Sequence, residues 1–138
     1  QKALAFLTAR VGAQLRDARL AARTVVLKLR HDDFLTVTRR TTLPAATDLD
    51  DELLAAALAL LEPAWRDVRG RDRGVRLVGI TATGLDLAPA ADLFEAPARV
   101  RQRKLTDALD AVRSKFGADL LTPGRRFVPK PREDPTDP

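Results

Sequence analysis

The chain has 138 residues, of which 45% are apolar and 31% charged, and it contains no cysteine, no methionine and a single histidine, His31. This composition is typical of one globular domain that buries a core without cross-links. Disulfides, thiol catalysis and thiolate metal sites are excluded, and one histidine is too few for a histidine metal cage. The longest apolar run, Leu53–Leu61, is far shorter than the ~20 residues of a membrane span.

The net charge of +5 is distributed unevenly along the chain. Residues 1–47 carry a net +6, residues 48–65 carry −5, and residues 98–116 carry +4. If the basic segments converge in space, one face of the fold becomes basic and suits a polyanion. An arginine-rich surface with no partner explains the same distribution equally well.

The first two elements are a helix and a strand. Leu4, Leu7, Val11, Leu15 and Ala18 recur at helical spacing, which predicts an amphipathic helix over residues 2–20. Apolar and polar residues then alternate over residues 24–30, so we expect a strand with a basic, partly polar face.

A second strand, Phe34–Leu43, forms a hairpin with the first. A two-residue turn would bring Leu29 opposite a threonine, whereas a three-residue loop, Asp32–Phe34, pairs the apolar residues of both strands on one face. The other face then presents cationic and hydroxyl side chains, the types that contact phosphates. These are Lys28, Arg30, Thr36, Thr38 and Arg40.

Pro44 ends this strand, and a helix follows. Thr47 and Asp48, followed by acids at residues 50–52, are typical of a capped helix start with carboxylates at the positive end of the helix dipole. We expect a helix over residues 49–65, with Pro63 distorting its last turn. The residues expected to be buried are Leu54, Leu58, Leu61 and Trp65.

The remaining chain reads as a loop over residues 66–74, a strand over 75–83, an extended connector over 85–97, a helix over 98–116 and a disordered tail over 118–138. The apolar phase slips between Leu77 and Val78, which predicts a bulge. Gly117 is typical of a helix C-cap. The last helix carries Leu105, Leu109, Val112 and Phe116 on one face.

Four segments, in order, resemble the little-finger domain of Y-family DNA polymerases. They are Ala22–Arg30, Asp33–Arg39, Thr42–Pro44 and Val75–Ile80. The likeness covers residues 2–116 and is greatest to the DNA polymerase IV (DinB) group, with a looser similarity to ImuB relatives. It implies an α+β fold of βαββαβ type, in which two helices cover one face of a sheet and the other face lies against DNA. The family's first strand is missing from this sequence, and we expect that position 1 follows an internal cut.

The resemblance places DNA-backbone contacts on Lys28, Arg30, Thr36, Thr38, Arg39 and Arg76. Alternation in the hairpin independently puts the first four on the exposed face and adds Arg40. Arg39 shares its parity with Val37, so its contact requires the strand to end or twist there. Such contacts carry little sequence information and suit a protein that moves over any template. The DNA-binding unit would span residues 1–84, followed by the connector 85–97, the helix 98–117 and the tail.

Family members also carry a clamp-binding peptide of the form Gln-Leu-x-Leu-Phe. Here the corresponding segment is Ala90–Phe94, which keeps the Leu-Phe pair and lacks the leading Gln and Leu. We expect Asp92, Leu93 and Phe94 to contact the beta sliding clamp, because exposed apolar anchors fill hydrophobic pockets. The alternative is that Leu93 and Phe94 pack against the edge of the sheet.

No catalytic or metal site is predicted in this chain, and no cofactor. By resemblance, magnesium would be held by carboxylates in the palm domain of the parent polymerase. The acidic pair at residues 32–33 belongs to the hairpin loop, and the acidic triplet at residues 50–52 to a helix N-terminus. We expect His31 to be a residue at the end of a strand and Trp65 to continue the row of core residues. The expected function is primer–template binding in a translesion polymerase of the bacterial cytoplasm, associated with the nucleoid and not with membranes.

Two other functions remain open. One is a non-catalytic, ImuB-like adapter that holds the sliding clamp and repair proteins. The other is an unrelated RNA-binding domain, although such sheets usually carry aromatic residues for stacking and the predicted open face has none.

Overall fold

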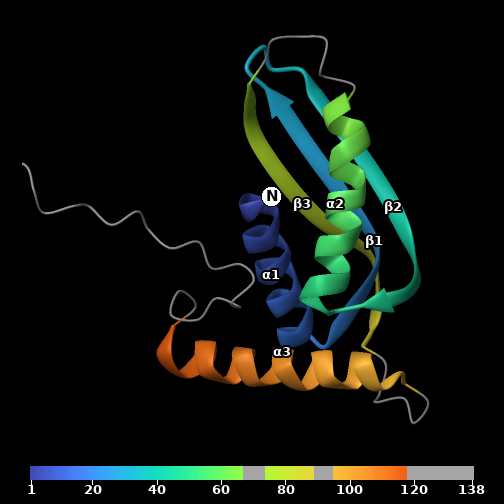
Figure 1. The fold of residues 1–138 in the computed structure, drawn as a ribbon, viewed down its shortest axis with the longest axis vertical. Helices are drawn as coiled ribbons and strands as arrows, with labels where there is room; N and C mark the ends of the chain where they lie inside the picture. Colours follow the sequence, from blue (N-terminus) through green and yellow to red (C-terminus); the bar gives the residue numbers. More distant parts are fainter. Residues whose placement is uncertain (67–73, 89–94, 118–138) are drawn as a thin grey trace, which may run out of the picture.

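The structure is a computed structural model that describes residues 1–66, 74–88 and 95–117. The elements in chain order are α1 (Lys2–Asp17), β1 (Leu20–His31), β2 (Thr36–Thr47), α2 (Asp50–Arg66), β3 (Val75–Leu87) and α3 (Pro97–Phe116). The strands form an antiparallel sheet in the order β2-β1-β3, with α1 and α2 against one face (Figure 1). The predicted α+β class is confirmed.

The core lies between the helices and the central strand. Val25, Leu27 and Leu29 of β1 are fully buried, whereas Lys28 between them is exposed. This alternation is the period of two that the sequence predicts, with the apolar side toward the helices. Burying a side chain of this size contributes about 1.5–3 kcal/mol, so this row anchors the sheet to α1 and α2.

The hairpin between β1 and β2 has the predicted three-residue loop. Leu29 pairs with Val37, and the His31 N–H donates to the Leu35 carbonyl at 2.9 Å. Phe34 closes the loop with a φ of 64°, the left-handed conformation that the last residue of such loops adopts. The register therefore puts the apolar residues of both strands on the helix-covered face.

Both helices differ in detail from the expected pattern. α1 ends at Asp17 because Arg19 adopts a φ of 55° and turns the chain into β1. In α2 the buried stripe is Leu53, Ala56, Ala57, Leu60 and Ala64, while Leu54, Leu58 and Leu61 are half-buried. Three alanines on this stripe let α2 pack closely on the sheet, which turns the larger leucines toward its flanks.

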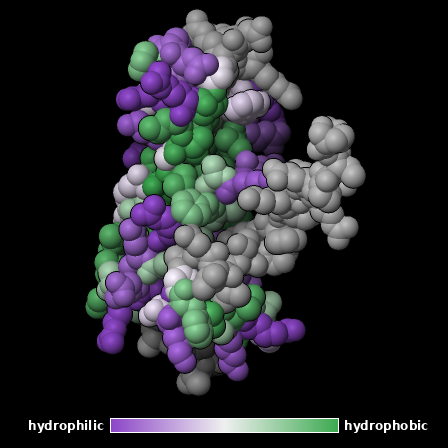
Figure 2. All heavy atoms as spheres, turned by 90° about the vertical axis from the view of Figure 1, so that its left-hand side faces the viewer, coloured by the Kyte–Doolittle hydropathy of each residue, from purple (hydrophilic) through white to green (hydrophobic). Residues whose placement is uncertain are grey.

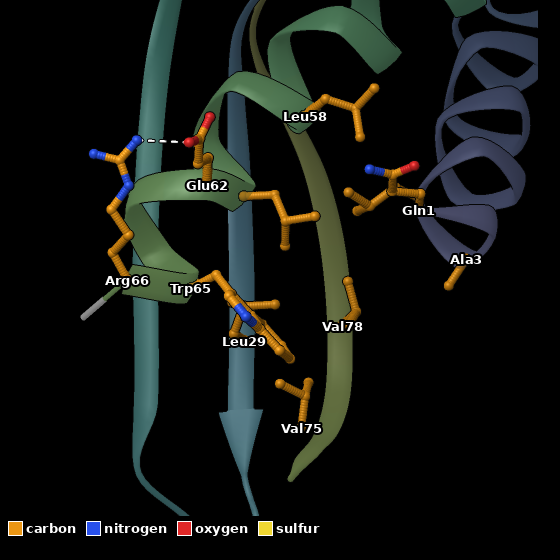
Figure 3. Close-up of a pocket in the computed structure, with 11 residues that line it drawn as sticks. Gln1, Ala3, Leu29, Leu58, Glu62, Trp65, Arg66, Val75 and Val78 are labelled. Atoms are coloured by element: carbon orange, nitrogen blue, oxygen red, sulfur yellow. Dashed lines mark hydrogen bonds and ion pairs between the residues drawn. The ribbon is translucent and has the colours of Figure 1, made fainter. Parts of the chain in front are cut away.

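Trp65 is not in the core, so that prediction is wrong. Its side chain is 45% exposed because the neighbouring Ala64 takes the buried position. Trp65 lines an apolar hollow of ≈ 640 Å³ together with Leu29, Leu58 and Val78, between α2, β3 and the start of α1 (Figure 3). The side of the molecule that carries β3 and the start of α1 shows a band of apolar side chains (Figure 2).

β3 is longer than predicted and its bulge lies elsewhere. The strand continues to Leu87, into the segment expected to be a connector. The register shifts where Arg30 and His31 pair with Leu77 and Val75, so Arg76 is the extra residue of the bulge. The bulge was predicted between Leu77 and Val78, and it lies just before Leu77. The predicted loop over 67–73 and the tail over 118–138 lie outside the described residues.

α3 lies across the end of the molecule where α1 ends and α2 begins (Figure 1). Its predicted apolar face is largely not the packed face: Leu105 and Phe116 are 52% and 60% exposed, and Leu109 and Val112 are half-buried. Thr106 is the buried residue of this fully described helix. Gly117 ends it as predicted, donating its N–H to the Arg113 carbonyl at 2.8 Å. In the described part of the chain, no helix has both the length and the hydropathy of a membrane span.

Candidate nucleic-acid interface

The face of the sheet opposite α1 and α2 is open. Residues that pair directly across antiparallel strands point to the same face, so the register arranges this surface in rows from β2 across β1 to β3. The four rows are Thr36, Arg30 and Leu77; Thr38, Lys28 and Gly79; Arg40, Val26 and Thr81; and Thr42, Thr24 and Thr83. We call these twelve positions the open face.

The chemistry of the open face is one-sided. It carries three cations and six threonines, and none of its twelve positions, all of them described, holds an acid or an aromatic residue. The hydroxyls sit on β-branched side chains with few rotamers, which fixes them above the strands. A surface with this composition offers hydrogen-bond donors and positive charge to an anionic partner.

The cations of this face lie over the central strand and its β2 edge. The Arg30 Nε donates to the Thr36 hydroxyl at 3.3 Å, which tilts the guanidinium toward β2. Lys28 and Arg40 are exposed, and within the described residues no carboxylate forms an ion pair with either of them or with Arg30. Their charge is thus available to a ligand.

Gly79 lies beside Lys28 in the middle of the open face. A Cβ at this position would lie 3.9 Å from the Cβ of Lys28 and would meet nothing closer. The missing side chain leaves a shallow place beside the lysine, where a partner can approach the backbone of β3.

The structure brings together five of the seven residues predicted to contact DNA. Lys28, Arg30, Thr36, Thr38 and Arg40 lie on the open face as alternation predicted. Arg39 pairs with Leu27 and therefore belongs to the helix-covered side, where its guanidinium donates to the Thr38 carbonyl at 3.2 Å. The strand does not end at this position, because β2 continues to Thr47.

Arg76 occupies a separate place at the hairpin end of the sheet. As the bulge residue it belongs to none of the four rows, and its guanidinium carbon lies 5.1 Å from the ring centroid of Phe34. This is cation–π distance, and Phe34 is 64% exposed. The arrangement holds Arg76 at the hairpin loop, beyond the row formed by Thr36, Arg30 and Leu77.

Sequence reasoning missed the third of the open face that β3 supplies. Leu77, Gly79, Thr81 and Thr83 follow each other at intervals of two, which is a strand signal. Their face could not be assigned because it depends on which strand β3 pairs with and in which register. The predicted clamp-contacting residues Asp92, Leu93 and Phe94 lie outside the described residues. Across the described ranges, no three acidic or histidine side chains are grouped so that they could hold a metal ion.

Comparison with known proteins agrees with this architecture. Residues 1–108 match the impB/mucB/samB family C-terminal domain. DNA polymerase IV of Desulfatibacillum aliphaticivorans is 36% identical over 126 residues, which cover 88% of this chain and 31% of the relative. DNA polymerase IV 1 of Mesorhizobium japonicum is 35% identical over 138 residues, which cover 93% of this chain and 30% of the relative.

A shorter match is to a relative of the same name. DNA polymerase IV of Streptococcus pneumoniae serotype 4 is 37% identical over 84 residues, 61% of this chain and 23% of the relative. The chain therefore spans less than a third of the length of these relatives. On this match and on its fold, the chain belongs to the impB/mucB/samB C-terminal domain family, the little-finger domain of Y-family DNA polymerases.

Proposed function

We propose that this domain binds primer–template duplex DNA through its open face, without reading sequence, and so tethers an error-prone translesion polymerase to its substrate. The observation that carries the proposal is the composition of the open face: three cations, six threonines and no acid. Lysine, arginine and hydroxyl side chains are the usual donors to phosphate oxygens. The name of the relatives, DNA polymerase IV, supports a polymerase as the parent protein.

The interface would hold the backbone of the duplex and would be insensitive to base sequence. Arg30 and Lys28 are two residues apart on one strand, about 7 Å at the usual rise of a β-strand, so both can reach neighbouring phosphates. Threonine hydroxyls on either side add neutral donors. Binding of this kind releases counterions and therefore weakens as salt rises.

The test is a titration of the chain against a fluorescent primer–template duplex by anisotropy at several salt concentrations. For Lys28→Ala/Arg30→Ala we expect weaker binding and a plot of log affinity against log salt that is shallower by about 2, one unit for each lost phosphate contact. Lys2→Ala/Arg10→Ala, which removes the same charge from exposed positions of α1, is the matched control and should keep the wild-type slope. Equal slopes for the two variants would contradict the proposal.

The same assay separates DNA from RNA as the ligand. RNA-binding sheets hold single strands by stacking bases on aromatic side chains, and the open face has no aromatic residue. Duplex DNA should therefore outcompete single-stranded RNA of equal length. Preference for the RNA would favour an RNA-binding domain instead.

We also propose a contact between Asp92, Leu93 and Phe94 and the beta sliding clamp. It rests on the sequence alone: a Leu-Phe pair of the type that anchors in an apolar pocket. Leu93→Ala/Phe94→Ala should abolish binding to the purified clamp, measured by surface plasmon resonance, and leave duplex binding unchanged. Clamp binding that survives this change would exclude the contact and, with it, the adapter function for this segment.

A further inference from the structure

α3 is attached to the rest of the domain by charged side chains. Arg99 Nε lies 3.0 Å from Glu52 Oε1, and Arg103 Nη1 lies 3.1 Å from Asp48 Oδ1. Arg113 Nη1 lies 4.0 Å from Asp50 Oδ2. The three acids stand just before and within the first turn of α2, and we call them, with Asp51, the acidic rim.

A second set of contacts starts from Arg16 of α1 and reaches both α3 and the acidic rim. Arg16 donates to both carboxylate oxygens of Asp110, and also to Asp50 Oδ1 at 2.9 Å and to the Asp48 carbonyl at 2.5 Å. Burial lowers the pKa of Arg16, but its hydrogen bonds and charge interactions with Asp110 and Asp50 outweigh this effect and raise the pKa overall. Gln102 donates to Asp51 at the next position along the rim.

No apolar side chain of the fully described helix α3 is buried, and Val100, Leu109 and Val112 are half-buried. Thr106 is the buried residue of α3, and its hydroxyl donates within the helix, to the Gln102 carbonyl at 2.9 Å. Leu105 and Phe116 are more than half exposed. The segment 98–116 carries a net +4, and the four carboxylates of the acidic rim carry −4. Charge complementarity is thus the principal force that places α3.

Such an attachment is reversible and sensitive to competing anions. The arginine side chains of the three pairs are 15–28% exposed, so water and salt reach them, and partly exposed ion pairs are individually weak and screened by salt. A guanidinium group binds phosphate with the same forked geometry as carboxylate. Duplex DNA offers one negative charge for every ~1.7 Å of its axis, a denser array than the acidic rim.

We propose that α3 is a detachable arm, held on the acidic rim by charge and displaced from it by the phosphate backbone of DNA bound to the domain. Displacement transfers Arg99, Arg103 and Arg113 from carboxylates to phosphates and opens the acidic rim to solvent. The inference rests on the proposed function for the identity of the displacing polyanion. The salt sensitivity of the attachment does not depend on it.

α3 itself supplies a matched control. Arg101, Lys104 and Lys115 are exposed on the same helix and form no ion pair with another described residue. Arg99→Gln/Arg103→Gln/Arg113→Gln removes the three cations of α3 that contact the acidic rim and leaves Arg16 of α1 in place. Arg101→Gln/Lys104→Gln/Lys115→Gln removes the same charge from the outer face and leaves those contacts in place.

The experiment measures the distance between α3 and α2 in the 138-residue chain. Because the chain has no cysteine, Ala59→Cys and Ala111→Cys, both at exposed positions, give two specific sites for fluorophores or spin labels. At low salt we expect one short distance in the wild type. Raising KCl from 50 to 500 mM should increase the long-distance population by about tenfold, as expected for the loss of three weak pairs. Saturating duplex should produce the same long-distance population at low salt.

The variants decide between charge and packing as the cause. The Arg99/Arg103/Arg113 variant should show the long distance at low salt without DNA, and its far-UV circular dichroism should show that the rest of the domain stays folded. The Arg101/Lys104/Lys115 variant should behave as the wild type. A distance that is unchanged by salt, or equal behaviour of the two variants, would overturn the proposal. So would duplex binding, followed by anisotropy in the same samples, without a change in distance. A duplex that does not bind at all contradicts the proposed function instead, and the salt titration then decides the attachment alone.

Discussion

Gly12 shows how one residue sets the distance between two helices. It lies in the middle of α1, where glycine is less favourable than alanine by about 1 kcal/mol. A Cβ at this position would lie 2.2 Å from Asp50 Oδ1 and 3.3 Å from the Asp48 carbonyl oxygen. The start of α2 therefore approaches the backbone of α1 directly, and this approach brings Arg16 within reach of Asp48 and Asp50.

We expect Gly12→Ala to destabilise the domain, although the same change stabilises most helices. The added methyl group must push α2 away or displace the Asp50 side chain, and overpacking of this kind costs about 1–3 kcal/mol. Urea denaturation followed by circular dichroism measures the effect. Gly79→Ala is the control, because its Cβ meets nothing nearer than 3.9 Å and its effect should stay within about 0.5 kcal/mol. A more stable Gly12→Ala chain would show that the two helices can separate freely.

At the scale of the element, α2 and α3 show where helical periodicity fails as a guide to packing. Both carry apolar stripes at the correct spacing, yet α2 buries alanines beside its leucines, and α3 turns a polar face inward. For α3 the reason is the long-range charge of the acidic rim, which no local pattern contains. The acids at the start of α2 lie at the positive end of its helix dipole, and Glu52 and Asp48 also bind arginines of a helix about fifty residues away.

This difference leads to a prediction on the stability of α3 variants. Leu105 is 52% exposed, so Leu105→Gln should change the free energy of unfolding by less than about 0.5 kcal/mol. Leu53→Ala, which removes a fully buried side chain of α2, should cost about 2–5 kcal/mol. Thermal and urea unfolding of both variants measure these values. A large loss for Leu105→Gln would mean that the apolar stripe of α3 is packed after all.

At the scale of the whole molecule, the fold determines which of the charged segments lie together. The basic segment 98–116 lies on the acidic segment 48–65 and does not join the basic hairpin. The positive open face is thus made by the hairpin and β3 alone. Within the described residues the domain separates the cationic open face, which carries no acid, from an end where charges of both signs are paired.

The loop and register of the hairpin could be predicted because their information is local, but the strand ends could not. The prediction that Pro44 ends the second strand is wrong, because β2 continues to Thr47 along the edge of the sheet, where a missing N–H is tolerated. Alternation in β1 and β2 and the preference for one apolar face fix the loop length, the register and the face of Lys28, Arg30 and Thr38. The remainder of the site depends on contacts between distant segments. Thr81 and Thr83 join the open face through pairing with β1, and Arg76 is set aside by a bulge that depends on the same pairing. Trp65 was misplaced because its exposure depends on how closely α2 packs on the sheet.

Among the described strands, β2 and β3 form the two edges of the sheet, and these edges differ in how well they resist pairing with another chain. The edge strand β2 contains Pro44, which has no N–H to donate, and its register with β1 shifts near Ala22, so its ladder is interrupted. The edge strand β3 has thirteen residues without a proline, and Arg76 and Asp86 are its only charges. Leu85 and Leu87 stand exposed near its end. Within the described fold, β3 is therefore the edge that remains competent to accept a fourth strand, and the sheet can grow on that side without any change to the open face.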